Sequence, residues 1–151
     1  MPFYLATIVV AIFDHLIKLF FQSHFLPGQS VVLLPQVVKL TYVRNTGAAF
    51  SLFTGMSNYL AIVAILISCL VIYLHFRLPA KQLSCQLALG FILGGSLGNL
   101  IDRLGRGFVV DYIDFGWWPV FNLADIMINV GVALLLFYFI FGEGKDASRS
   151  V

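Results

Sequence analysis

Charged residues are scarce in this sequence. Asp, Glu, Lys and Arg make up 11% of the 151 residues, whereas hydrophobic residues make up 60%. A soluble domain usually has about a quarter of its residues charged, so this chain has too few charges to cover a globular surface. The scarcity excludes an ordinary soluble domain and predicts an integral membrane protein. Because the nine Lys and Arg residues form no basic patch, we expect no nucleic-acid partner.

Metal ligands and nucleophile–base pairs are also missing. Cys69 and Cys85 form no CxxC pair and lie in apolar runs, where we expect small buried side chains rather than a disulfide or a metal site. His15, His24 and His75 share no ligand spacing, and no HExxH motif occurs. These absences argue against a metal enzyme and leave no plausible histidine base for a Ser or Cys nucleophile.

Four long apolar segments dominate what is present, at residues 3–21, 59–76, 83–101 and 119–141. Each is close to the ~20 residues of a membrane-spanning helix. The first begins without Lys or Arg and lacks an A-x-A cleavage pattern, so we expect a retained span rather than a removed signal peptide. The sequence therefore predicts a single α-helical integral membrane domain over residues 1–151, with an outer loop at about 23–56 and a polar tail at 142–151.

Four spans place both termini on one side of the membrane. The short loop 77–82 and the tail carry as many positive charges as the two opposite loops, but in much shorter segments. The positive-inside rule then favours cytoplasmic termini. In the outer loop, the alternation of residues 39–44 predicts a strand, and Asn45-Thr46-Gly47 predicts a turn. We expect a small extracytoplasmic β-structure on the membrane surface; the alternative is a plain connecting loop.

Polar residues from three spans reach nearly one depth. At ~1.5 Å rise per residue, Asp125 and Asp102 lie ~24 and ~27 Å from the cytoplasmic ends of their spans, and Asp14 and Lys18 lie ~20 and ~26 Å from theirs. These depths fall just inside the outer boundary of a ~30 Å hydrocarbon core. Snorkelling explains Lys18 alone, because an Asp side chain is too short to reach far. Ionisable residues inside spans usually mark a functional site, which we therefore expect at this level.

Two further patterns concern packing and anchoring. Gly90, Gly94 and Gly98 recur every four residues, a spacing that allows close helix contact in a membrane. No strand precedes them and no Lys-Ser/Thr pair follows, which excludes a phosphate-binding loop. An aromatic cluster near the start of the fourth span predicts anchoring at the membrane interface, with a lipid-facing groove as the alternative. Its members are Tyr112, Phe115, Trp117, Trp118 and Phe121.

Three carboxylates, Asp111, Asp114 and Asp125, lie at or beyond the outer ends of the spans. Two carboxylates held close together cannot both ionise easily, so they share a proton and can act as acid and base around a water molecule. A small proton- or ion-coupled carrier and a non-catalytic scaffold protein are the alternatives; a carrier would spread its polar residues through the membrane. Amide hydrolysis also needs polar groups that orient the carbonyl, for which the candidates are Asn45, Asn99 and Asn122.

Five motifs extend this pattern over nearly the whole chain. In order they are FDHLIK (13–18), RNTGAAFSLF (44–53), GGSLGNLIDR (94–103), VVDYIDF (109–115) and FNLAD (121–125). Through their order and spacing the chain resembles the lipoprotein signal peptidases (signal peptidase II), which are four-span aspartic peptidases of bacterial inner membranes. One departure is His15, where the family often has Gln.

The resemblance implies roles for nine residues. Asp111 and Asp125 match the catalytic pair of the family. The positions that support the site and bind substrate match Asn45, Asn99, Arg103 and Asn122. Further motif positions match Asp14, Lys18 and Asp102, for which we expect supporting or structural roles through ion pairing.

The resemblance also implies a substrate and a location. The substrate is a prolipoprotein whose cysteine already carries a diacylglyceryl group, and the enzyme cuts on the N-terminal side of that cysteine. No metal or organic cofactor is implied. We expect a monomeric, multi-pass protein of the bacterial inner membrane, in contact with membrane lipids, with its active site near the outer leaflet.

Overall fold

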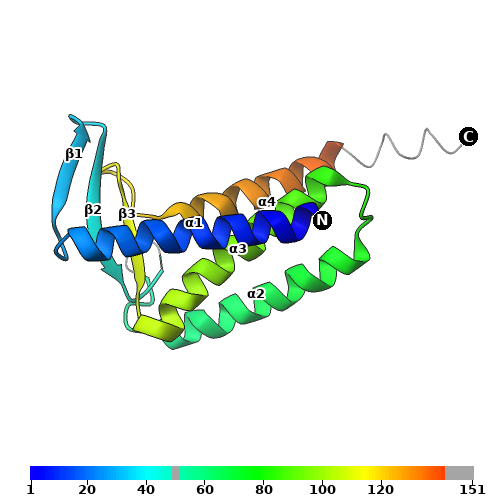
Figure 1. Cartoon of the computed structure of the whole chain (residues 1–151), viewed down its shortest axis with the longest axis horizontal. Helices are drawn as coiled ribbons and strands as arrows, with labels where there is room; N and C mark the ends of the chain where they lie inside the picture. Colours follow the sequence, from blue (N-terminus) through cyan, green and yellow to red (C-terminus); the bar gives the residue numbers. More distant parts are fainter. Residues whose placement is uncertain (49–51, 142–151) are drawn as a thin grey trace, which may run out of the picture.

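Four helices and a three-stranded sheet form the fold in a computed structural model that describes residues 1–48 and 52–141 (Figure 1). The helices are α1 (Pro2–His24), α2 (Ser57–Arg77), α3 (Leu83–Arg106) and α4 (Leu123–Phe141). The strands are β1 (Ser30–Leu34), β2 (Val38–Asn45) and β3 (Val109–Asp114). All four helices are long and apolar enough to span a membrane, which confirms the predicted fold class. The predicted tail at 142–151 lies outside the described residues.

Two helix boundaries differ from the predicted spans by four residues or more. α3 continues to Arg106, five residues beyond the predicted end at 101, and stops at Gly107, whose φ of 76° is the left-handed conformation that favours glycine. α4 begins at Leu123 rather than at 119, because Phe121 instead forms an isolated β-bridge with Ile113. Hydropathy alone detects neither feature. The two shifts place Asp102 in the last turns of α3 and Asp125 in the first turn of α4.

The predicted glycine contacts join α1 to α3, the most buried of the four helices. A Cβ atom added to Gly90 would lie 2.6 Å from the carbonyl oxygen of Phe3, and one added to Gly94 would lie 2.8 Å from that of Thr7. Side chains at these positions would force the two helices apart. The small residues therefore allow the backbones to approach closely, as predicted, and they set the spacing at which polar side chains of α1 reach α3.

α2 contacts α3 through a narrow stripe of its surface. The buried side chains of α2 are small or medium in size, as in Ala61, Ala64 and Ser68. Cys69 lies next to this stripe on the outward face and is exposed, so the prediction that it is buried was wrong, whereas Cys85 is buried as predicted. Burial could not be derived from apolarity here, because a lipid-facing helix is apolar on its exposed faces too.

The sheet is antiparallel with the strand order β1-β2-β3, and β2 pairs with β3 so that Val43 lies opposite Asp111. The β-structure predicted in the outer loop is thus confirmed. A small core joins it to α1, where the ring of Phe21 stacks on Tyr112 with centroids 4.5 Å apart. Tyr112 is therefore a core residue and not an interface anchor, whereas Trp117 is 78% exposed. Contact of the sheet with a membrane surface remains a prediction.

The sheet lies at one end of the helix bundle (Figure 1). The N-terminus, the connection between α2 and α3 and the end of α4 lie at the opposite end. This arrangement agrees with an even number of spans that places both termini on one side. Which side of the membrane that is remains a prediction.

Candidate active site

Polar side chains from five elements converge where the sheet meets the bundle. They include all nine residues singled out in the sequence: Asp14 and Lys18 of α1, Asn45 of β2, Asn99, Asp102 and Arg103 of α3, Asp111 of β3, and Asn122 and Asp125 at the start of α4. The common depth predicted from helical rise is thus matched by contact in space.

Asn122 connects the two candidate catalytic carboxylates. Its side-chain Nδ2 donates to Oδ1 of Asp111 at 2.7 Å, and its backbone N–H donates to Oδ2 of Asp125 at 3.2 Å. The backbone N–H of Asp125 in turn donates to the side-chain oxygen of Asn122 at 3.0 Å. This reciprocal pattern is a helix-capping box in which Asp replaces the usual Glu. A carboxylate is therefore accommodated in an apolar run because it caps the start of a helix, where negative charge is favourable.

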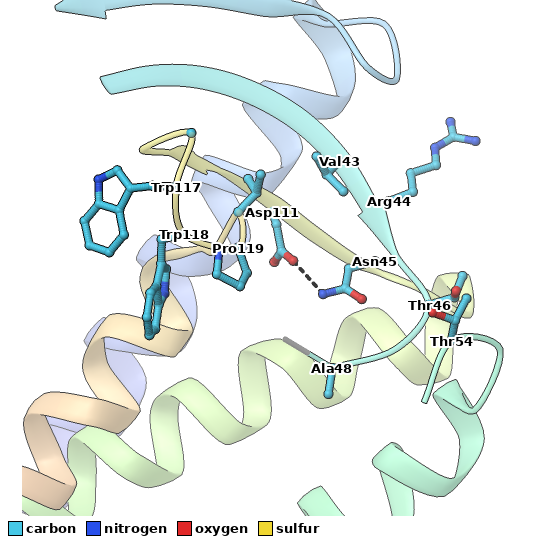
Figure 2. A pocket seen from close by; sticks show the side chains of 12 residues that line it. Val43, Arg44, Asn45, Thr46, Ala48, Thr54, Asp111, Trp117, Trp118 and Pro119 are labelled. Carbon is cyan, nitrogen blue, oxygen red and sulfur yellow. Dashed lines mark hydrogen bonds between the residues drawn. The ribbon is translucent and has the colours of Figure 1, made fainter. Parts of the chain in front are cut away.

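Two further amides each hold one carboxylate. Nδ2 of Asn45 donates to Oδ2 of Asp111 at 2.8 Å, an interaction that Figure 2 shows as a dashed line. Nδ2 of Asn99 donates to Oδ1 of Asp125 at 2.8 Å. Both oxygens of each carboxyl group therefore accept a hydrogen bond from an asparagine, which orients the pair from three different elements.

A buried ion cluster lies behind the pair. Nζ of Lys18 lies 2.7 Å from Asp14 and 3.2 Å from Asp102, and none of these three side chains is exposed. Asp102 also contacts Arg106 at 2.6 Å and accepts a hydrogen bond from the backbone N–H of Val110 at 3.1 Å. Charges buried to this degree persist only when they are paired and hydrogen-bonded. The cluster thus fixes α1, α3 and β3 relative to one another.

Asp111 holds its proton more firmly than a free carboxyl group does. It is 2% exposed, and its burial together with repulsion from Asp125 raises its pKa to about 7, although the donors Asn45 and Asn122 oppose this shift. A carboxyl group with such a pKa is largely protonated below neutral pH. The geometry therefore places a carboxyl group with a raised pKa next to a second carboxyl group, an arrangement suited to acid–base chemistry on one substrate.

Two cavities open at Asp111. One, of about 540 Å³, is lined by sheet residues and by Trp117, and Figure 2 shows its Asp111 between Asn45 on one side and Trp118 and Pro119 on the other. The other, of about 630 Å³, contains both carboxyl groups and runs along α4. It is lined by, among others, Asn99, Arg103, Asp111, Trp118, Asp125 and Asn129. Both carboxyl groups thus line the cavity on the bundle side, and Asp111 also lines the cavity on the sheet side.

Comparison with known proteins identifies the family. The family model described as signal peptidase (SPase) II matches residues 6–141. The chain belongs to this family. It is 43% identical over 150 residues to the lipoprotein signal peptidase of Syntrophomonas wolfei, with 99% of each chain covered. It is also 43% identical over 139 residues to that of Desulfitobacterium hafniense, covering 91% of this chain and 92% of the other.

A solved structure supports the same assignment. A bacterial membrane enzyme determined by the in meso method at 2.3 Å resolution superposes with a TM-score of 0.84 at 32% identity, covering 97% of this chain and 90% of the other. The chain is therefore a peptidase of the signal peptidase II family and a membrane protein, which confirms the family, the fold and the reaction class predicted from the five motifs. The carrier and scaffold alternatives are not supported.

Asp114 lies apart from the pair, although its sequence position made it a candidate partner. One carboxyl oxygen accepts a hydrogen bond from Thr41 at 2.7 Å and lies 3.6 Å from Nζ of Lys39, and the other accepts from the backbone N–H of Gly116 at 2.7 Å. These contacts tie β3 to β2 and hold the turn that follows. Within the described residues, no group of three or more His, Cys, Asp or Glu side chains is placed to hold a metal ion.

Several cavity residues were not singled out as site residues from the sequence, and three of them are Trp118, Pro119 and Asn129. Trp118 and Pro119 line both cavities, and Asn129 lines the larger one. Trp118 had been assigned to an anchoring cluster, with a lipid-facing groove as the alternative. Asn129 carried a usable signal, because a lone amide in the run from Ile126 to Phe141 is as conspicuous as Asp125.

Proposed function

We propose that this member of the signal peptidase II family removes the signal peptide from prolipoproteins whose cysteine carries a diacylglyceryl group. It cuts on the N-terminal side of that cysteine, with Asp111 and Asp125 as the catalytic pair. The observation that carries the proposal is the bridging of these two carboxyl groups by Asn122 inside one cavity. The family membership supports the substrate class.

The two carboxyl groups take different roles in this mechanism. Asp125, held by the amide of Asn99 and by the start of α4, takes a proton from water, and the hydroxide adds to the scissile carbonyl. Asp111, which keeps its proton up to about pH 7, hydrogen-bonds the carbonyl oxygen as negative charge develops there. When the C–N bond breaks, the proton of Asp111 passes to the leaving amine. The pair then holds one proton on Asp125 and returns to its starting state by proton exchange.

Arg103 supplies positive charge to the same cavity. Its guanidinium donates to the carbonyl oxygen of Gly47 at 3.5 Å and lines the larger cavity with both carboxyl groups. A guanidinium has donors beyond the one used here, which suits it to hold a carbonyl of the substrate. Asn45, Asn99 and Asn122 serve as positioning residues for the pair. Asp14, Lys18 and Asp102 hold the surrounding helices.

We further propose a monomer of the bacterial inner membrane with cytoplasmic termini and its active site near the outer leaflet. The acyl chains of the substrate then remain in that leaflet while the scissile bond reaches the pair. The distribution of positive charge in the loops and the position of the site at the end of the bundle opposite the termini support this placement.

Cleavage of a purified, diacylglyceryl-modified prolipoprotein, followed by a gel shift, tests the proposal. The wild type is expected to cut, and folded Asp111→Asn and Asp125→Asn variants are expected to lose at least about 1,000-fold in rate, because each removes one half of the acid–base pair. Asp114→Asn is the matched control and is expected to keep its activity. A folded wild type that never cuts would overturn the substrate assignment, and an Asp111→Asn variant with near-normal activity would overturn the pair.

A further inference from the structure

Asn129 lies one helical turn beyond Asp125 in α4, in an otherwise apolar stretch (Ile126, Met127, Ile128, then Val130). Its side chain is exposed and lines the larger cavity together with both carboxyl groups. An exposed amide in a membrane-spanning helix is costly unless it contacts a polar partner. The position of Asn129 on the cavity wall therefore calls for a partner inside that cavity.

A hydrogen bond to the backbone fixes the orientation of the side-chain amide of Asn129. Nδ2 donates to the backbone carbonyl oxygen of Asp125 at 2.8 Å. A backbone carbonyl only accepts hydrogen bonds, so the NH2 group must face it and the amide cannot be turned over. In the part of the chain that the structure describes, no donor contacts the side-chain oxygen of Asn129. The groups that remain for a ligand are the second N–H of Nδ2 and the side-chain oxygen, and the oxygen is a free hydrogen-bond acceptor.

An acceptor selects between the two parts of a lipidated peptide substrate. The diacylglyceryl group has ester oxygens and a thioether sulfur, which accept hydrogen bonds but donate none. A peptide bound in extended form has backbone N–H groups without partners, and these must be satisfied wherever water is excluded. The side-chain oxygen of Asn129 needs a donor, which the peptide chain has and the lipid lacks.

Distance along the helix locates the partner. Four residues of helix separate Asn129 from Asp125 by ~6 Å along the axis, and an extended peptide advances ~3.3 Å per residue. The partner is then about two residues from the scissile bond. Asn129 lies further from the sheet than Asp125 does, toward the opposite end of the bundle, the direction in which we expect the apolar signal peptide to extend.

We propose that the side-chain oxygen of Asn129 binds a backbone N–H of the signal peptide, two or three residues before the scissile bond. The inference rests on the proposed function and adds a subsite to it. Asn129 is a binding residue in this account and takes no part in proton transfer.

The test pairs a protein variant with a substrate variant. Synthetic diacylglyceryl-modified peptides are made with an amide or an ester at each of the last four linkages before the cut, since an ester lacks the N–H. Wild type, Asn129→Leu and Asn129→Thr are compared by kcat/KM in the same detergent. The Thr hydroxyl can donate to the carbonyl four residues earlier and still accept a hydrogen bond. Val132→Leu, on an exposed part of α4 outside the cavity lining, is the control.

We expect the wild type to lose about 5- to 10-fold in kcat/KM with an ester at the second or third position, the size of one hydrogen bond. With the all-amide peptide, the kcat/KM of Asn129→Leu should fall by a similar factor, and replacing the amide by that ester should cause no further fall in this variant. Asn129→Thr should retain part of the wild-type kcat/KM, and Val132→Leu should match the wild type. If the wild type cuts all the ester peptides with equal kcat/KM, the inference is overturned while the proposed function stands, even if a variant fails to fold. The inference is also overturned if the ester lowers kcat/KM as much in Asn129→Leu as in the wild type. A wild type that cuts no peptide overturns the proposed function together with the inference.

Discussion

Lys18 of α1 and Asn99 of α3 are joined by a 2.8 Å hydrogen bond between Nζ and the side-chain oxygen. An ammonium group only donates, so the amide of Asn99 must present its oxygen to Lys18 and its NH2 group to Asp125. The same Asn99 oxygen also accepts from Asn122 at 3.1 Å. A buried cation on one helix thereby orients a carboxylate on another through a single amide.

Replacing Lys18 with Met should destabilise the protein and abolish most activity. The substitution keeps the length of the side chain but leaves Asp14 and Asp102 without their shared cation, and breaking a buried ion pair costs about 3–5 kcal/mol. Thermal unfolding in detergent and peptide cleavage measure the two effects. Lys81→Met, at an exposed position of the loop between α2 and α3, is the control and should be nearly neutral. Similar melting temperatures for the two variants would contradict the role of Lys18.

Replacing Asn45 with Leu should shift the alkaline limb of the pH–rate profile to higher pH. In the proposed mechanism activity requires a protonated Asp111, so we expect activity to fall as the pH rises through the pKa of this group, which burial and Asp125 raise to about 7. The hydrogen bond from Asn45 opposes that rise by stabilising the ionised form, so its loss raises the pKa of Asp111 further. The profile is measured as kcat/KM against pH, with Asn58→Leu, at an exposed position of α2, as the control. An unmoved or lowered alkaline limb would speak against Asp111 as the acid.

Asp111 should make the stability of the wild type depend on pH. Because its pKa is raised from 3.8 to about 7 in the folded protein, the folded state holds this proton more tightly than the unfolded state. The contribution of protonated Asp111 to the free energy of unfolding is complete below about pH 4 and is lost as the pH rises to about 7. Asn does not titrate, so the melting temperature of Asp111→Asn minus that of the wild type should increase over this range.

Asp114→Asn should show the opposite trend. Burial raises the pKa of Asp114, but the hydrogen bonds from Thr41 and Gly116 and the charge of Lys39 outweigh this effect and lower it overall. The stabilisation from Asp114 is therefore present at neutral pH and is lost as the pH falls through its lowered pKa. Differences in melting temperature that follow the same course for both variants would contradict the distinct environments of the two groups.

Replacing Gly94 with Ala should separate α1 from α3. The added Cβ would lie 2.8 Å from the carbonyl oxygen of Thr7 and 2.8 Å from Cβ of Val10, and such overpacking costs about 1–3 kcal/mol. Gly105→Ala, in the same helix with nothing within 4 Å of the added Cβ, should be neutral or stabilising by up to about 1 kcal/mol. Thermal unfolding of the two variants side by side decides the point. If both variants lost the same thermal stability, the effect of Gly94→Ala would not come from the contact between α1 and α3.

The residues differ in how far their placement could be predicted. Asp14, Lys18 and Asp102 could be assigned to one depth because helical rise is regular, and the glycine spacing predicted the contact that joins their helices. The late start of α4 could not be predicted, since the bridge between Ile113 and Phe121 pairs segments that are remote from the hydropathy signal. Tyr112 was assigned to an interface anchor because an aromatic ring suits a membrane interface and a protein core equally well.

The sequence by itself determined the four apolar helices, because a membrane requires long apolar segments. The residues alone left both Asp111 and Asp114 as possible partners of Asp125, and only the tertiary structure shows the physical reason why Asp111, which the resemblance implies, is the partner. The pairing of β2 with β3 places Asp111 opposite Val43 and Asp114 opposite Lys39, so Asp111 alone reaches Asn45 and Asn122. Strand register and helix contacts join residues far apart in the chain, and no local pattern in the sequence encodes which of two nearby aspartates they select.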